Sequence, residues 1–325
     1  MSNTSKKAVI MMATYNGERY LKEQLKSLSD QTFKNWDLYV SDDGSKDRTI
    51  EILKRFQKKD SRLKAIIMNQ GKHGAYNNFF NVMDHIKKID TQYDYFFYCD
   101  QDDIWIQTKL ENEIRILSQI GGPALCYSDL ELINSDGKKL HRRMGEITDI
   151  KLHNKYNIFF SPKYIWGTTM AHNLALWNLI YIDPEINNRF NISHDNYVGK
   201  YAAVYGKIIF IPFPQVLYRR HGDNVSGIPG KYNMVKRLLT DLPEIINNHS
   251  TIYWEDLYFI RHAPLKSKFL ADLKKAIDSG GNKATKFIKV YDIYTSDSLV
   301  SRLSIKLILF SKLYKRTKIF NRKII

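Results

Sequence analysis

Cysteine is scarce in this chain: its 325 residues include only Cys99 and Cys126. So few thiols exclude a secreted fold held together by several disulfides and predict a reducing compartment, while a single disulfide between the two stays open. The remaining composition, 43% hydrophobic and 26% charged, is that of an ordinary globular protein. Disordered and collagen-like chains are therefore excluded, and the length suffices for one large core or two smaller ones.

Long apolar runs are also missing. No stretch reaches the roughly 18 consecutive apolar residues that a membrane-spanning helix needs, and the mean hydropathy is −0.41. The first apolar run, Ala8–Ala13, follows two lysines but is too short for a signal peptide and continues directly into polar residues. We therefore expect a β-strand at this position and a chain that does not cross a membrane.

Acidic residues are outnumbered, with 34 Asp and Glu against 50 Lys and Arg, which gives a net charge of +16 and a pI near 9.5. An excess of this size favours a polyanionic partner. Half of it lies in the last 25 residues, Ser301–Ile325, which contain no acid. The cations there are Arg302, Lys306, Lys312, Lys315, Arg316, Lys318, Arg322 and Lys323. Nucleic acid is not the expected partner, because no RNA-binding signature is present and the acidic clusters described below would repel a phosphate backbone.

The first hundred residues alternate between two patterns. Short apolar runs are found at 8–13, 36–40, 63–68 and 93–99, and helical patterns lie between them at 18–28, 47–57 and 77–88. This alternation predicts an α/β fold with a mostly parallel sheet flanked by helices. The fourth run is aromatic and uncharged at its centre, which is typical of a strand buried on both faces.

The second half of the chain changes character near Gly230. Before it, we expect helices at 109–117 and 196–205 and strands at 124–128 and 207–212. After it, only helical patterns with basic faces remain, at 232–247, 267–277 and 303–314. The sequence therefore predicts an α/β domain over residues 1–229 and a basic helical C-terminal region over residues 230–325.

One acidic cluster, Asp100-Gln101-Asp102, follows the fourth predicted strand. Ligands bind at the carboxyl edge of open α/β sheets, and two carboxylates there are suited to a hard divalent cation that completes its shell with phosphate oxygens and water. Alternatively, Asp102 or Asp103 caps the next helix. Capping alone explains three neighbouring acids poorly, because their mutual repulsion requires a compensating positive charge.

A second acidic cluster, Asp42 to Asp47, follows the second predicted strand. A carboxylate of Asp42 or Asp43 is placed to accept hydrogen bonds from a nucleobase or a ribose. The alternative, which this pattern by itself favours, is a turn in which Ser45 or Asp47 caps the following helix.

Two later segments carry groups suited to catalysis. Asp195, after His194, starts a predicted helix and could act as a general base, while His221 follows Tyr218-Arg219-Arg220 and could bind a metal or donate to a phosphate. Arg219 or Arg220 would stabilise the growing charge of a departing diphosphate. A lone histidine or a lone helix-start aspartate is also commonly structural, and that alternative stays open.

Four motifs in order resemble the family 2 glycosyltransferases. They begin with Thr14-Tyr15-Asn16-Gly17-Glu18 and Val40-Ser41-Asp42-Asp43-Gly44-Ser45, followed by Asn69-Gln70-Gly71 and Cys99-Asp100-Gln101-Asp102-Asp103-Ile104-Trp105. The last motif, together with His194-Asp195 and the stretch Tyr218–Asn224, is most similar to bacterial rhamnosyltransferase-type enzymes. The resemblance covers about residues 6–225.

The resemblance implies a GT-A fold, which is Rossmann-like, with a nucleotide-sugar donor held at the carboxyl edge of the sheet. It places nucleotide-binding residues at Thr14, Tyr15, Asn16, Glu18, Asp42 or Asp43, Asn69, Asp100 and Gln101. The family's DxD position falls on Asp100-Gln101-Asp102, which places Asp100 and Asp102 at a divalent metal, Mg²⁺ or Mn²⁺. Asp102 is the better candidate for direct contact, and His221 would reach the metal or the diphosphate. The loop Trp166-Gly167-Thr168-Thr169 would border the donor and acceptor sugars. Asp195 matches the base position, although the family often has an acidic pair where this chain has His194-Asp195.

The expected function is that of an inverting, metal-dependent hexosyltransferase. By the resemblance, it moves L-rhamnose from dTDP-rhamnose, or another sugar from a UDP-sugar, to a glycan or polyprenyl-linked acceptor in bacterial surface polysaccharide synthesis. We expect a cytoplasmic protein, with the basic helices docked on an anionic membrane surface or, alternatively, forming a packed subdomain or an oligomer interface. A catalytically silent GT-A scaffold or a carbohydrate-binding protein is the alternative function. A sugar-nucleotide pyrophosphorylase is disfavoured, since the first loop lacks the glycine-rich basic sequence that would hold a triphosphate.

Overall fold

The computed structural model describes residues 6–148, 150–161, 164–183, 192–222, 242–293 and 299–321. The chain divides into two compact units. The first comprises Met1–Ile150 and Ile165–Gly227, and the second comprises Lys151–Tyr164 and Ile228–Ile325. A single cut in the sequence near residue 230 does not capture this division, because the segment 151–164 belongs with the C-terminal helices.

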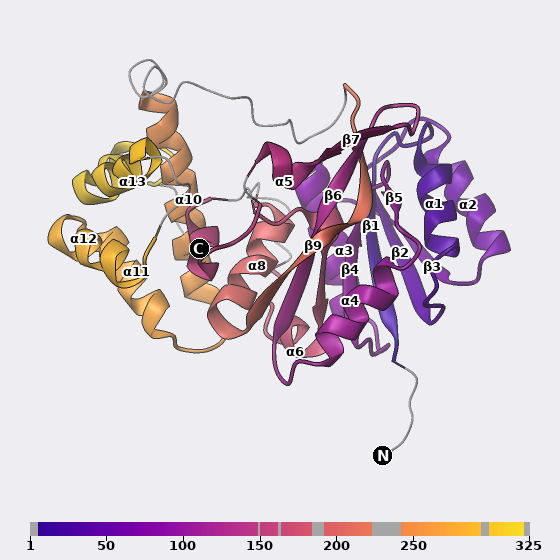
Figure 1. Cartoon of the computed structure of the whole chain (residues 1–325), viewed down its shortest axis with the longest axis horizontal. Coiled ribbons are helices and arrows are strands. Elements are labelled where there is room, and N and C mark those ends of the chain that lie inside the picture. The colour runs from indigo at the N-terminus through magenta and orange to yellow at the C-terminus, as the bar shows by residue number, and fades with distance from the viewer. Residues whose placement is uncertain are drawn as a thin grey trace. The chain divides into compact units, whose positions relative to one another are not determined.

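The first unit contains one mixed sheet of nine strands in the order β3-β2-β1-β4-β8-β6-β9-β5, with β7 paired to β6 (Figure 1). The strands are β1 (Ala8–Thr14), β2 (Trp36–Asp42), β3 (Leu63–Met68), β4 (Tyr95–Cys99), β5 (Ile104–Trp105), β6 (Ala124–Ile133), β7 (Lys139–Arg143), β8 (Met170–Asn173) and β9 (Lys207–Arg219). Strands β3, β2, β1 and β4 are parallel to one another, as the alternation of patterns predicts. Strand β8 is antiparallel to both β4 and β6, and β9 returns parallel to β6.

The register of the parallel strands brings their carboxyl ends together. Thr14 of β1 lies opposite Asp42 of β2, and Met12 of β1 lies opposite Cys99 of β4. All residues of β1, β2 and β4 are buried, because the apolar side chains of a central parallel strand are covered on both faces. Each polar loop that follows these strands therefore starts at the same edge of the sheet.

The sequence patterns did not predict three of the strands. Strand β5 has only two residues, β8 contains polar His172 and Asn173, and all five residues of β7 are exposed. Each of these segments lacks the apolar run or alternation that identifies a strand in a sequence. The strands predicted at 124–128 and 207–212 are also longer than expected, because β6 and β9 continue as a long parallel pair to Ile133 and Arg219.

Helices of the first unit flank this sheet (Figure 1). They are α1 (Leu21–Ser29), α2 (Thr49–Lys59), α3 (Ala75–Lys88), α4 (Lys109–Ser118), α5 (Met144–Ile147), α6 (Leu174–Trp177) and α8 (His194–Tyr205), together with the 3-10 turn η2 (Gly167–Thr169). Helix α3 packs on β1 and β2, α4 packs on β6 and β8, and α8 packs on β6 and β9. Helix α8 therefore places its N-terminus, with His194 and Asp195, within the sheet-bearing unit.

The described part of the second unit is helical. It contains η1 (Lys155–Phe159), α10 (Leu242–His262), α11 (Lys268–Ser279), α12 (Gly281–Val290), α13 (Leu299–Ser311) and η3 (Leu313–Arg316). Aromatic rings form its core; Tyr156 stacks on Phe269 with 3.9 Å between ring centroids, and Phe269 also packs on Phe287. Of the helix predicted at 232–247, residues 232–241 lie outside the described part, and the described residues continue as α10 to His262. Helix α12 was not predicted.

The structure also bears on cysteine and membrane spanning. Cys99 in β4 and Cys126 in β6 are both buried with free thiols, so neither closes a disulfide with the other. Within the described ranges, no helix has the combination of length and apolar composition needed to cross a bilayer.

Candidate functional site

The polar loops at the carboxyl edge fall into two groups, and the loops after β1, β2 and β3 form the first. Asp42 is fully buried, and its two carboxylate oxygens accept four hydrogen bonds. The donors are Thr14 Oγ1 (2.8 Å), Ser45 Oγ (2.6 Å), Ser45 N (2.8 Å) and Gly44 N (3.1 Å). This arrangement braces the turn after β2 and favours the structural interpretation of Asp42 over direct nucleotide contact.

Asp43 joins the loop after β2 to the loop after β3. Its Oδ1 accepts from Asn69 Nδ2 at 2.6 Å and lies 3.0 Å from His73 Nδ1, while its Oδ2 accepts from Gly74 N at 2.7 Å. The structure thus brings together the predicted residues Asp43 and Asn69. Sequence reasoning missed His73, whose side chain is 70% exposed; its only signal was its position in the loop after a predicted strand.

Gln101 fastens the loop after β1 to the loop after β4. Its side-chain amide makes a reciprocal pair with the main chain of Tyr15, in which each hydrogen bond measures 2.9 Å. Gly17 leaves the room for this pair, since a Cβ there would lie 2.8 Å from Gln101 Cδ, too close for any real contact. The Gln101 amide is therefore a brace between loops, while half of the surface of Tyr15 is exposed.

Asn16 and Glu18 complete the first group by linking the loops after β1 and β2. The Asn16 amide nitrogen of the main chain donates to Ser45 Oγ, and Asn16 Oδ1 accepts from Lys46 N, both at 2.8 Å. Glu18 accepts from the Arg48 main chain at 2.8 Å. These contacts hold the loop in which the resemblance placed the nucleotide.

The second group is an acidic cluster after β4, formed by Asp100, Asp102 and Asp103. Burial, together with the charges of Asp102 and Asp195, raises the pKa of Asp100 to about 8. Burial, together with the charges of Asp102 and Asp100, raises the pKa of fully buried Asp103 well above its ordinary value. The carboxylates of this cluster therefore repel one another without enough positive charge to compensate them.

Asp102 and His221 form a carboxylate–imidazole pair at this cluster. Asp102 Oδ2 lies 2.9 Å from His221 Nε2, and both side chains are largely buried. The imidazole packs beside the Tyr20 ring at 5.0 Å between centroids. The structure thus brings together two residues separated by 119 positions in the chain, as the resemblance implied.

Arg219 holds the main chain of Asp102 through a hydrogen bond. Its guanidinium is fully buried, and each of its three nitrogens donates to a protein oxygen: Nε to the Asp102 carbonyl at 2.8 Å, one terminal nitrogen to the Ser135 carbonyl at 3.1 Å, and the other to the Glu23 carboxylate. Arg219 therefore fixes the main chain of Asp102. Of the two predicted arginines, Arg220 is the one whose side chain is exposed.

Asp195 lies at the start of α8, facing the loop that precedes β8. Its Oδ1 accepts from Asn196 N at 2.6 Å and from the Ser193 hydroxyl, and its Oδ2 accepts from Gly167 N at 3.1 Å. Burial raises the pKa of Asp195 to about 7 despite these hydrogen bonds. A carboxylate with this pKa can accept a proton near neutral pH.

Trp166, Gly167 and Thr168 border the acidic cluster. The Trp166 ring packs edge to face on Tyr218 at 5.2 Å between centroids, and Thr168 is buried. Burial and the charges of Asp103, Asp100 and Asp102 raise the pKa of the Tyr218 phenol. Tyr218 and Glu23 were not predicted as site residues. Tyr218 was visible only as the first residue of the stretch Tyr218–Asn224, whose last two residues, Asp223 and Asn224, lie outside the described part.

A divalent cation fits the chemistry of this donor set. Asp102 supplies a carboxylate, His221 a ring nitrogen, and the surplus negative charge around Asp100 and Asp103 would be offset by a cation. In the part of the chain that the structure describes, however, no three histidine, cysteine or acidic side chains converge to hold a metal by themselves. An ion at this pair would therefore depend on phosphate oxygens and water for the rest of its shell.

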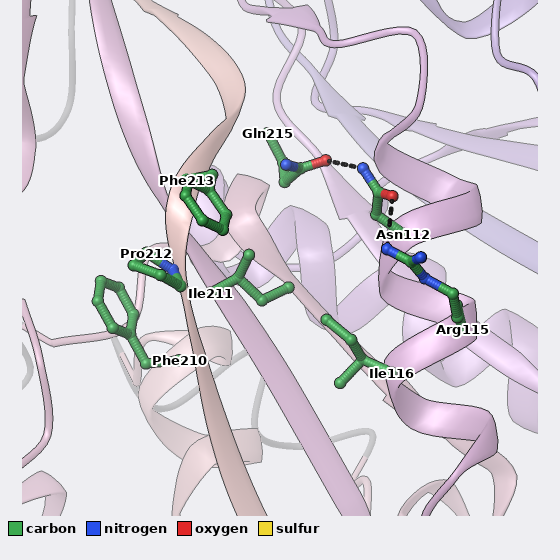
Figure 2. A pocket seen from close by; sticks show the side chains of 8 residues that line it. All are labelled: Asn112, Arg115, Ile116, Phe210, Ile211, Pro212, Phe213 and Gln215. Atoms are coloured by element: carbon green, nitrogen blue, oxygen red, sulfur yellow. Dashed lines mark hydrogen bonds between the residues drawn. The ribbon is translucent and has the colours of Figure 1, made fainter.

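A cavity of about 210 Å³ lies elsewhere in the first unit, between α4 and β9 (Figure 2). Its lining is mostly apolar and includes Phe210, Ile211, Pro212 and Phe213 of β9 and Ile116 of α4. None of the predicted site residues line it, and no carboxylate does. This cavity is therefore separate from the acidic edge.

Comparison with known proteins agrees with the fold and the motifs. The sequence model described as glycosyl transferase family 2 matches residues 9–224. The chain is 31% identical over 224 residues to the dTDP-rhamnosyl transferase RfbG of Shigella flexneri, which covers 66% of this chain and 73% of that protein. It is 32% identical over 129 residues to the UDP-Glc:alpha-D-GlcNAc-diphosphoundecaprenol beta-1,3-glucosyltransferase WfgD of Escherichia coli, covering 39% and 47% of the two chains. Among solved structures, residues 1–349 of S. aureus TarS, in complex with UDP-GlcNAc, share the fold at a TM-score of 0.53 and 15% identity, covering 95% of this chain and 81% of that one.

Proposed function

The chain belongs to glycosyl transferase family 2 and is a hexosyltransferase of bacterial polysaccharide synthesis, and we propose that it transfers L-rhamnose from dTDP-rhamnose with inversion. The observation that carries the proposal is the acidic edge of the sheet. There the Asp102–His221 pair and Asp195 belong to one electrostatic cluster, since the charges of Asp102 and Asp195 both act on Asp100. The cluster supplies both functions that the reaction requires: a place for a diphosphate and a base.

The diphosphate side of the site is formed by Asp102, His221 and Arg220. Asp102 and His221 would hold Mg²⁺ or Mn²⁺, which supplies positive charge against the departing diphosphate. Arg219 keeps the Asp102 main chain in place, and exposed Arg220 is available for the phosphate oxygens. The DxD role of Asp100-Gln101-Asp102 divides accordingly: Asp102 would hold the ion, Asp100 adds negative charge, and Gln101 braces the loop.

Asp195 acts as the general base. The acceptor hydroxyl oxygen forms a bond to the anomeric carbon while the bond from that carbon to the phosphate oxygen breaks. The electron pair leaves with the nucleoside diphosphate, and the hydroxyl proton passes to the Asp195 carboxylate. A single displacement of this kind inverts the anomeric carbon and needs no covalent intermediate.

The nucleotide is held by the first group of loops. Tyr15 presents an exposed ring for stacking on the base, and Thr14, Asn16 and Glu18 line the same loop. Of the two candidate aspartates, Asp43 is the better contact for base or ribose. Its Oδ2 accepts a hydrogen bond from Gly74 N, whereas Asp42 is fully buried and accepts four hydrogen bonds. Asn69, bonded to Asp43, would complete this side of the pocket.

The donor and acceptor are inferred from the relatives. RfbG is named as a dTDP-rhamnosyl transferase, and the name of WfgD specifies a diphosphoundecaprenol-linked acceptor. We therefore assign dTDP-rhamnose as donor, with a UDP-sugar as the competing choice, and a polyprenyl diphosphate-linked glycan as acceptor. Trp166, Gly167 and Thr168, which border the acidic cluster, would contact the sugars.

The second unit supports docking on an anionic membrane, the surface at which a lipid-linked acceptor resides. On α13, Leu307 and Phe310 are 59% and 50% exposed, and exposed Lys306 and Lys312 flank them. Apolar side chains surrounded by cations suit the interface of an anionic bilayer. The protein would then work in the cytoplasm, peripheral to the inner face of the membrane.

Vesicle sedimentation tests this docking. We expect the protein to bind vesicles containing phosphatidylglycerol and not pure phosphatidylcholine. The double variant Leu307→Ser/Phe310→Ser should weaken binding by about tenfold or more, while Leu265→Ser, a matched change at another exposed leucine of the second unit, should not. Unchanged vesicle binding by the double variant rules out α13 as the membrane surface, and a change in oligomeric state instead would make it a subunit interface.

Calorimetric titration tests the catalytic assignment. Purified protein is titrated with thymidine, uridine, guanosine and cytidine diphosphates, each with and without Mn²⁺. We expect metal-dependent binding of thymidine diphosphate, followed by release of thymidine diphosphate from dTDP-rhamnose when a lipid-linked acceptor is added. Metal-dependent binding of uridine diphosphate alone would reassign the donor. Binding of none would support a catalytically silent scaffold or a carbohydrate-binding protein instead.

A further inference from the structure

His194, the residue before the proposed base, is buried without a polar partner. Its side chain is 4% exposed, and neither ring nitrogen has a hydrogen-bond partner among the described residues. The imidazole stacks on Phe79 at 3.8 Å between centroids and lies near Tyr98 at 5.3 Å. Burial lowers its pKa to about 3, so the ring is neutral and serves as a flat packing element rather than as a charge.

The edge of this ring that carries Nε2 and Cε1 faces Gly167. A Cβ at position 167 would lie 2.9 Å from His194 Cε1 and still closer to Nε2, a separation at which one of the two groups has to move. The backbone of Gly167 is outside the left-handed region, so its conformation does not demand glycine. The missing side chain is therefore required by space alone, because the imidazole occupies it.

This fit reaches the proposed base through one hydrogen bond. Asp195 Oδ1 is held from within its own helix region, by Asn196 N and the Ser193 hydroxyl, whereas Oδ2 is held by Gly167 N at 3.1 Å. The hydrogen bond from the Gly167 N–H thus ties the Asp195 carboxylate to a different element, η2. Any shift of η2 would release Oδ2 and let the carboxylate rotate.

We propose that Gly167 and His194 are positioning residues for Asp195: the imidazole, wedged between Phe79 and Gly167, holds η2 where its N–H fixes the oxygen that receives the acceptor's proton. This inference rests on the proposed role of Asp195 as the base. It explains why a buried histidine without hydrogen bonds precedes the base, where a second acid would introduce another repelling charge beside Asp195 and Asp100.

Gly167→Ala tests the fit. The added methyl group has to displace η2 or the imidazole, and a displacement of about 1 Å at a reacting group can cost about 10²-fold in rate. We therefore expect kcat to fall by about 10²-fold, while the affinity for thymidine diphosphate, which lacks the sugar, changes less than threefold. Gly121→Ala is the matched control, because a Cβ at Gly121 meets nothing within 4 Å; its kcat should equal that of the parent.

The double variant Gly167→Ala/His194→Ala separates positioning from general damage. Removing the imidazole frees the space that the methyl group needs, so kcat should recover by at least about tenfold relative to Gly167→Ala alone. His194→Ala alone should lower kcat by about tenfold, since η2 loses its support, and it replaces Gly167→Ala as the test if that variant does not fold. Thermal unfolding of all variants records any loss of stability.

The outcomes keep the two proposals apart. If Asp195→Asn retains full transfer, the proposed base is wrong. If Asp195→Asn abolishes transfer while Gly167→Ala and His194→Ala keep the parent kcat, Asp195 remains the base and the positioning role is overturned. A double variant no faster than Gly167→Ala would likewise contradict the wedge between imidazole and glycine.

Discussion

Two acidic clusters follow strands on either side of β1, and their carboxylates have opposite surroundings. After β2, Asp42 and Asp43 receive hydrogen bonds from hydroxyl, amide and main-chain donors. After β4, Asp103 is buried and Asp100 is partly exposed, and desolvation together with the neighbouring carboxylate charges raises the pKa of both. In the sequence, both clusters are groups of aspartates that follow an apolar run. Their different roles therefore depend on the number of hydrogen-bond donors around each carboxylate: a carboxylate with several donors holds a loop in place, and one with few donors can bind a cation or a proton.

The largest expected effect comes from removing the proposed base, Asp195, whose charge acts on Asp100 of the second cluster. Asp195→Asn keeps the shape of the side chain but cannot take the acceptor's proton, so the transfer rate should fall by about 10²–10⁴-fold. Rapid-quench measurement of rhamnosyl transfer gives the rate, and calorimetry should find the affinity for thymidine diphosphate unchanged. A parallel loss of nucleotide binding would make Asp195 a structural cap of α8.

The next largest effect is expected from an isosteric substitution of Asp102 in the second cluster, which should weaken binding of the proposed cation. Asp102→Asn removes one charge from the Asp102–His221 pair and should weaken Mn²⁺-dependent binding of thymidine diphosphate by about 10²-fold, with a matching loss of turnover. Calorimetry with and without Mn²⁺ measures the change. Transfer at the parent rate would eliminate Asp102 as a metal ligand.

The pH dependence of the transfer rate tests whether Asp195 acts as a base with a raised pKa. Burial raises its pKa from 3.8 to about 7, and a base works only when ionised. The rate should therefore rise about tenfold per pH unit below pH 7 and level off above it. The Asp195→Asn variant should lack this limb in its residual activity; a parent profile that is flat across this range would contradict the assignment.

The same isosteric change in the first cluster should affect stability rather than chemistry. Asp42→Asn places an amide against the donors of Thr14 and Ser45, so the free energy of unfolding should fall by about 1–3 kcal/mol. Urea denaturation measures this loss. Folded Asp42→Asn should bind thymidine diphosphate within threefold of the parent, and a loss as large as that of Asp102→Asn would erase the distinction between the clusters.

Much of the α/β framework could be predicted from residue patterns. Strand β3 has the predicted bounds, and β1, β2, α3 and α4 agree within about two residues, because their apolar runs and helical periods are unbroken. Strands β5, β7 and β8 were missed, since their formation depends on partners distant in the sequence rather than on their own composition. The sequence patterns also did not show that residues 151–164 belong to the second unit, because this too depends on contacts with residues distant in the sequence.

Within the candidate site, the sequence identified residues better than roles. Arg219 was expected beside a diphosphate, yet its guanidinium is committed to Asp102, Ser135 and Glu23. Gln101 was expected at the nucleotide, yet its amide is paired with the Tyr15 main chain. A residue type and its spacing do not reveal which donors and acceptors the remainder of the fold will place around it.

The family, the parallel half of the sheet and the acids at its carboxyl edge could be predicted from the sequence. They follow from strand periodicity and from the order of the motifs, which are local properties of the chain. Only the tertiary structure shows which carboxylates accept hydrogen bonds from several donors. It also shows that His221 contacts Asp102 and that His194 packs against Gly167 beside Asp195. These facts depend on contacts between residues that lie tens to more than a hundred positions apart, and burial and hydrogen bonding at such contacts set the charge and orientation of each group.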